Sequence, residues 1–177
     1  MPSGRTHDAI TFFLAVPAAI GAYLFSHNVG SAVTVGAAFI FGGLMFGPDL
    51  DTVSRQYSRW FILRFLWIPY RRFFKHRSRF SHGLIFGAFI RVVYFMGAVT
   101  LASFLVLYIY AAYTGGKLPL MADFARTWQP IGEFVRNKLG EYFLPLVFVG
   151  LWFGAASHTF TDMAGSFIKT GRIAKFL

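Results

Sequence analysis

The chain has 177 residues and no cysteine, and 56% of its residues are hydrophobic whereas only 14% are charged. A soluble domain carries about a quarter charged residues, so the composition favours an integral membrane protein over a soluble globule. The lack of cysteine excludes a disulfide framework, a thiolate zinc site and a cysteine nucleophile, and the net charge of +10 indicates either nucleic-acid binding or cationic cytoplasmic loops.

Four apolar segments predict four membrane-spanning helices, at residues 9–25, 30–47, 92–112 and 142–162. The second segment is rich in glycine, which allows a helix to pack closely against a neighbour. The third lies within a longer apolar run, so we expect Arg91, just before it, at the membrane interface and not in mid-bilayer. The sequence therefore predicts an all-α, four-span transmembrane helical bundle that forms a single integral membrane domain over residues 1–177.

The distribution of cations predicts the orientation of these spans. Eight cations and no acid lie in residues 52–83, between the second and third spans. The positive-inside rule then places the basic segment 48–83 and both termini in the cytoplasm. Within it, residues 55–79 should attract anionic lipid headgroups, at about 1 kcal/mol per cation. Membrane lipids, and no nucleic acid, are therefore the predicted partners.

Two further stretches combine aromatic and basic side chains, at residues 60–74 and 120–139. This composition is typical of helices that lie in the plane of the membrane interface. We therefore expect two interfacial helices beside the four spans.

Histidines and acids are rare in this chain, yet most of them occur in four tight clusters: His7-Asp8, Asp49-x-Asp51, His76-x5-His82 and His158-x3-Asp162. In the predicted topology each cluster lies at the cytoplasmic end of a span or in the segment that joins two spans. Imidazole and carboxylate groups suit Zn, Fe, Mn or Ni, so their convergence at one membrane face predicts a divalent metal site. The remaining histidine, His27, lies on the opposite side and has no assigned role.

Two of the clusters have a local geometry that suits ligands. His158 and Asp162 are four residues apart, so both side chains leave the same face of a helix. Pro48 ends the second helix and favours an extended backbone, in which Asp49 and Asp51 would point the same way.

Each cluster also has a simpler explanation. His158 and Asp162 could form a packing pair, and Asp49 and Asp51 could cap the next turn or pair with Arg55 and Arg59. Thr6 or Asp8 is a good N-cap for the first span. The remaining two histidines could be ordinary residues of a basic loop. These alternatives stay open at the level of the sequence.

Several motifs resemble a known family: residues 2–8 (PSGRTHD), 41–51 (FGGLMFGPDLD) and 76–83 (HRSRFSHG), together with the late His-x3-Asp. They resemble an uncharacterised family of metal-binding integral membrane proteins found largely in cyanobacteria. That family is similar, more distantly, to the LexA-regulated membrane-bound metal-dependent hydrolases. Their His-Arg-Gly-x-Thr-His block departs from this sequence, where five residues separate the histidines and Ser78 replaces the glycine. The resemblance implies metal ligands at His7, Asp49, Asp51, His76, His82, His158 and Asp162.

These observations lead to a functional hypothesis: a metal-dependent hydrolase that acts on a phosphoester or lipid-like substrate at the cytoplasmic surface of the plasma or thylakoid membrane. The cofactor would be a divalent metal ion, with Zn favoured over Mn and Fe. Asp49 or Asp51 would serve as general base or bridging ligand, and Arg77 and Arg79 would hold negative charge.

The alternative hypothesis is a non-catalytic metal-binding or structural protein that acts in assembly or trafficking of a membrane complex. Transport is a third class, but the spans carry no acid or histidine at mid-depth that could line a path for cations.

Overall fold

The computed structural model describes residues 3–74, 78, 80, 83 and 86–171, except for the side chain of Thr127. Every regular element within these residues is helical. The long helices are α1 (Gly4–Ser26), α2 (Val29–Met45), α6 (Phe86–Thr114), α7 (Met121–Leu139) and α8 (Phe143–Thr170). Four short elements follow α2, namely η1 (Pro48–Asp51), α3 (Arg55–Arg59), η2 (Phe61–Leu66) and α4 (Trp67–Phe73).

Helices α1, α2, α6 and α8 are each long and apolar enough to cross a membrane, by length and composition. They coincide with the four predicted spans, although α8 continues to Thr170, two turns beyond the predicted end. Helix α1 begins at Gly4 because the Ser3 side chain accepts a hydrogen bond from the Thr6 amide. The predicted N-cap at Thr6 or Asp8 is therefore wrong, and both residues lie within the first turns of the helix.

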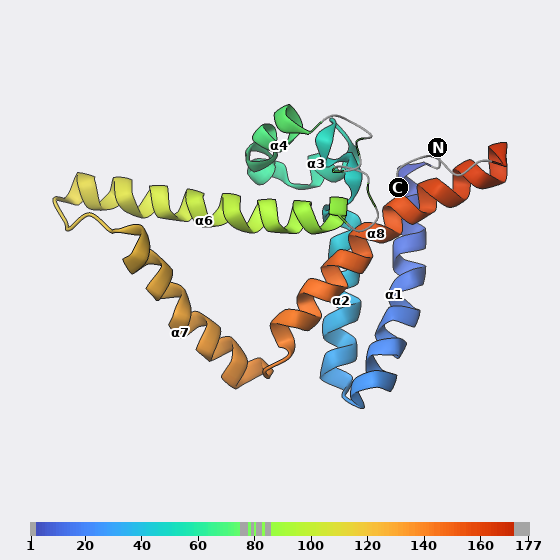
Figure 1. Ribbon diagram of the computed structural model, residues 1–177, viewed down its shortest axis with the longest axis horizontal. Helices are drawn as coiled ribbons and strands as arrows, with labels where there is room; N and C mark the ends of the chain where they lie inside the picture. The colour runs from blue at the N-terminus through green and yellow to red at the C-terminus, as the bar shows by residue number, and fades with distance from the viewer. Residues whose placement is uncertain (1–2, 75–77, 79, 81–82, 84–85, 172–177) are drawn as a thin grey trace.

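Figure 1 shows α1 and α2 side by side and antiparallel, with α8 crossing both of them. Helix α6 extends away from this group, and α7 returns from its far end to the start of α8, so that α6, α7 and α8 form three sides of a triangle. The buried residues of α6 all lie in its first two turns, from Gly87 to Val92. The structure thus differs from the predicted bundle, because three spans pack together and the fourth contacts them only near its beginning.

Glycines bring the backbones of α2 and α8 into direct contact. A Cβ atom on Gly154 would overlap the carbonyl oxygen of Phe39, and one on Gly42 would lie 2.8 Å from the Cα of Leu151. A Cβ on Gly43 would overlap the side chain of Thr11 and lie 3.0 Å from the carbonyl oxygen of Gly154. The close packing expected of the glycine-rich second span is therefore confirmed, and α1, α2 and α8 meet at one point.

Aromatic side chains of the predicted interfacial stretch 60–74 fold inward over the end of α2. Trp60, Trp67 and Tyr70 are buried in one core cluster with Phe46, whose ring contacts both tryptophans edge-on. The stretch is divided between η2 and α4 and does not form one continuous helix. Its role at a membrane interface stays a prediction, as does that of α7.

Arg91 lies beneath this aromatic cluster and is fully buried, with 0% of its surface exposed. Its Nε donates a hydrogen bond of 2.6 Å to the carbonyl oxygen of Phe46. The folded segment after α2 covers this side chain, and its expected position at the membrane interface stays a prediction. A buried cation requires polar partners, and here it ties α6 to the end of α2.

The glycine contact gives a direct test of the fold. We expect Gly154→Ala to destabilise the protein by about 1–3 kcal/mol or more, since the new methyl group has no space beside Phe39. The melting temperature of the detergent-purified protein should fall by several degrees.

Gly21→Ala is the matched control, because a Cβ on Gly21 of α1 would meet no atom within 4 Å. Equal melting temperatures for the two variants would contradict the packing described above.

Candidate metal centre

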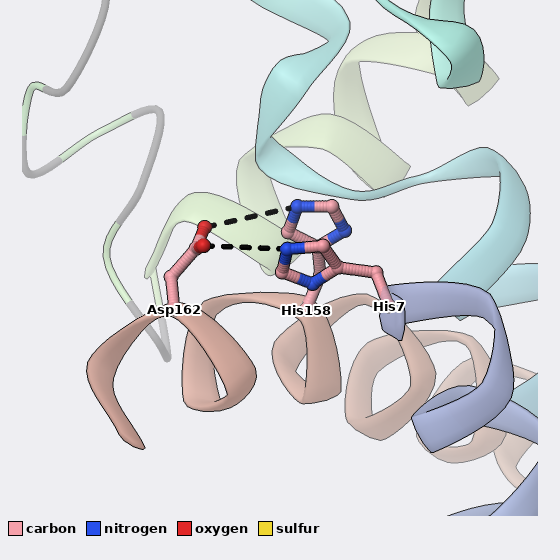
Figure 2. Close-up of side chains that lie close together, drawn as sticks. All are labelled: His7, His158 and Asp162. Carbon is pink, nitrogen blue, oxygen red and sulfur yellow. Dashed lines mark ion pairs between the residues drawn. The ribbon is translucent and has the colours of Figure 1, made fainter. Parts of the chain in front are cut away.

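Three buried side chains from two helices converge at the start of α1. His7 comes from α1, and His158 and Asp162 come from one face of α8, with both rings facing the carboxylate (Figure 2). His7 Nε2 lies 3.3 Å from Asp162 Oδ1, and His158 Nε2 lies 3.8 Å from Asp162 Oδ2. Tetrahedral zinc with bonds of about 2.0–2.1 Å holds its ligand atoms about 3.3–3.4 Å apart. One ligand atom from each residue of this triad, His7–His158–Asp162, lies within 4.8 Å of the others, so the three side chains would have to move closer together to bind one ion.

The chemistry of the triad also fits a divalent ion. His7, His158 and Asp162 are only 6%, 4% and 6% exposed. Within the described part of the chain, no hydrogen bond satisfies His158 Nε2 or Asp162 Oδ1, two atoms that face other members of the triad. Such buried polar atoms cost about 1–3 kcal/mol each when unsatisfied, so a ligand that engages them explains their placement.

The two imidazole rings are stacked, with centroids 3.8 Å apart and planes inclined by 6°. Because the rings are almost parallel, one ion bound by both Nε2 atoms would require them to splay.

Gln56 of α3 fixes the His158 ring from the other side. Its Nε2 donates to the carbonyl oxygen of Gly43 at 3.1 Å and lies 2.9 Å from His158 Nδ1. A Cβ on Gly47 would overlap this amide, so glycine there leaves room for it. If His158 Nε2 ligates a metal, Nδ1 keeps its proton. The Gln56 amide must then turn its oxygen toward the ring and give up its hydrogen bond to the Gly43 carbonyl oxygen.

The two predicted carboxylates of residues 48–51 do not point the same way. This segment forms the 3-10 helix η1 and is not extended, so side chains two residues apart diverge. Asp49 faces the triad, with Oδ2 3.5 Å from His158 Nε2 and its side chain 35% exposed. Asp51 is buried, and the predicted convergence with Asp49 is therefore wrong.

Asp51 belongs to the buried polar group around Tyr70. Burial raises the pKa of the Tyr70 hydroxyl above its ordinary value, the nearby Arg91 guanidinium opposes this, and Asp51 adds to it. Tyr70 therefore stays neutral at physiological pH. Asp51 thus lies on the side of η1 that faces Tyr70, whereas Asp49 lies on the side that faces the triad.

The other predicted ligands, His76 and His82, lie outside the described residues, as do Arg77 and Arg79. Asp8 is not part of the triad, because its carboxylate pairs with Arg59 at 2.6 Å and with Arg55 at 3.8 Å. Gln56 was not predicted, since a single amide within a basic segment has no spacing or periodicity that distinguishes it.

The contact between Gln56 and His158 yields a test of ligation. We expect Gln56→Leu to lower zinc affinity about 10–100-fold, because the Nδ1 proton of a zinc-bound His158 loses its acceptor. Gln56→Glu supplies a stronger acceptor and should restore the affinity. Competition against a chelator of known affinity measures both effects.

Gln129→Leu on α7 is the control, because Gln129 is exposed and far along the chain from the triad. Zinc affinity that is the same in Gln56→Leu as in this control would show that Gln56 does not support a metal ligand.

Comparison with known proteins agrees with this chemistry. Residues 2–172 match a family described as uncharacterized metal-binding protein (DUF2227). An uncharacterized protein of Aquifex aeolicus (strain VF5) is 27% identical over 140 residues, which cover 77% of this chain and 93% of that protein. No solved structure matches the chain. Since the match to the metal-binding family spans nearly the whole sequence, the chain belongs to that family.

Proposed function

We propose that the protein is a metal-dependent hydrolase that acts at the cytoplasmic membrane surface on a phosphoester or lipid-like substrate. The observation that carries this proposal is the triad with the half-exposed Asp49 at its edge, 3.5 Å from His158. Two histidines and one carboxylate form the ligand set of hydrolytic zinc sites, in which a fourth position stays open. This donor set favours Zn, with Mn or Fe as alternatives.

Each residue then has a defined task. His7, His158 and Asp162 would hold the ion, which when bound supplies Lewis-acid polarisation of the scissile group and lowers the pKa of water. Asp49 is the candidate general base, because its carboxylate is close to the triad and accessible to solvent. Buried Asp51 lies instead near Tyr70. Similarity to the LexA-regulated hydrolases and the cyanobacterial type stay predictions.

The four apolar helices support a membrane location, and the cations of residues 55–79 support a cytoplasmic site that contacts anionic lipid headgroups. Both a plasma membrane and a thylakoid membrane fit these features.

A second candidate function is non-catalytic metal binding in the assembly or trafficking of a membrane complex. The observation in its favour is the burial of all three triad side chains, since structural metal sites are closed. Asp49 distinguishes the two functions, because a structural site has no need of an accessible carboxylate beside its ligands.

The distinguishing experiment measures turnover in zinc-loaded protein reconstituted into phosphatidylcholine vesicles, with phosphatidic acid and p-nitrophenyl phosphate as test phosphoesters. We expect release of phosphate by the wild type. Asp49→Asn should reduce the rate about 10²–10⁴-fold, which is the range for loss of a general base, with the zinc content unchanged.

Asp123→Asn is the matched control, since Asp123 lies on the exposed surface of α7. If the protein binds stoichiometric zinc but hydrolyses neither phosphoester, the hydrolase proposal is wrong and the non-catalytic function is favoured.

A further inference from the structure

We infer that the substrate is a membrane lipid with a phosphate head, whose hydrocarbon chain lies in a groove between α1, α2 and α8. The catalytic part of this inference rests on the proposed function, whereas the binding part does not. Three observations carry it: the lining of the groove, its proximity to the triad and the arginines near the triad.

The groove has a volume of about 460 Å³, which is within the size range of small-molecule sites. Its lining is almost wholly apolar and comes from three helices that are each apolar enough to cross a membrane: Leu14, Phe39, Trp152, Phe153, Ala156 and Phe160. A charged or strongly polar ligand would lose its hydration there without compensation. The occupant that this lining fits is therefore a hydrocarbon chain.

The single polar side chain of the lining lies next to the triad. Ser157 lines the groove and is the residue before His158. Its hydroxyl lies 3.5 Å from that of Thr11, which is one helical turn after His7. The groove lining therefore includes the residue next to His158 and contacts a residue one turn from His7, so a lipid chain within it would place its head near the triad.

The surroundings at that end suit an anionic head. Arg55 and Arg59 line a second, more polar hollow of about 500 Å³ together with Ser54 and Ser58. Both arginines reach Asp8, the neighbour of His7, and the Cδ of Arg55 lies against Gly4. Arg59 pairs closely with Asp8, whereas Arg55 lies 3.8 Å from it and its side chain is 59% exposed, so the Arg55 guanidinium is accessible to a phosphate group.

A second apolar groove provides an internal comparison. It has a volume of about 580 Å³ and lies between α2 and the first turns of α8, where Ala37 contributes to its lining. It contains none of the triad residues or their direct neighbours. Both grooves are apolar, but only the lining of the first adjoins the triad, so only the first should prefer a lipid with a phosphomonoester head.

The experiment is photo-crosslinking with lysophosphatidic acid that carries a diazirine in its palmitoyl chain. The protein is placed in phosphatidylcholine nanodiscs with a chelator present, so that labelling requires no turnover. Because phosphatidylcholine, whose phosphate is a diester, is in large excess, labelling of the groove reports a preference for a phosphomonoester head. We expect the label on the α8 segment 152–160.

Ala156→Phe places a ring in the groove that would overlap the lipid chain. It should therefore reduce labelling about tenfold or more. Ala37→Phe, the same substitution in the other groove, should leave labelling unchanged. Leu14→Trp blocks the groove from α1 and serves if the first variant does not fold, as judged by size-exclusion chromatography.

Equal labelling of the wild type and the groove-filling variants would overturn the inference, and so would equal labelling of both grooves. Failure of the proposed function appears differently: the groove is labelled but no phosphoester is hydrolysed. Conversely, a hydrolase whose groove takes no label would keep its activity and lose this substrate class.

Discussion

The contact between backbones at Gly43 and Gly154 is the constraint on which the rest of the structure depends. A Cβ on Gly43 would collide with Thr11 of α1 and press on the carbonyl oxygen of Gly154 in α8. Thr11 is one turn after His7, and Gly154 is one turn before His158. Because three helices touch here through their smallest residues, the side chains one turn further along are brought together. The triad is thus a consequence of helix packing.

The aromatic segment after α2 gives this triad its enclosed surroundings. Phe46, Trp60 and Trp67 pack over the end of α2, and Arg91 reaches from α6 to the Phe46 carbonyl oxygen beneath them. The chain leading into η1 is thereby held in place, which directs Asp49 toward His158. A carboxylate at the edge of a buried donor set combines low dielectric with access for water, which is the combination that hydrolysis requires.

Much of the helical framework could be predicted because long apolar segments and the spacing of His158 and Asp162 are local features. The meeting of His7 with that pair followed from topology, since both lie at the same end of their spans. The divergence of Asp49 and Asp51 could not be predicted, because tertiary packing selects a 3-10 turn over an extended strand. Burial of Arg91 was also hidden, since the segment that covers it is equally suited to a membrane interface. Gln56 has no pattern of its own.

The central claim is that one divalent ion is held by His7, His158 and Asp162. Elemental analysis of detergent-purified protein, after incubation with zinc and removal of excess, tests it most directly. His158→Asn removes a ligand of the triad, whereas His27→Asn makes the same change at an exposed histidine whose left-handed backbone asparagine tolerates. The account predicts about one zinc per chain in the wild type and in His27→Asn, and a folded His158→Asn protein without zinc. Equal zinc in all three proteins would contradict it.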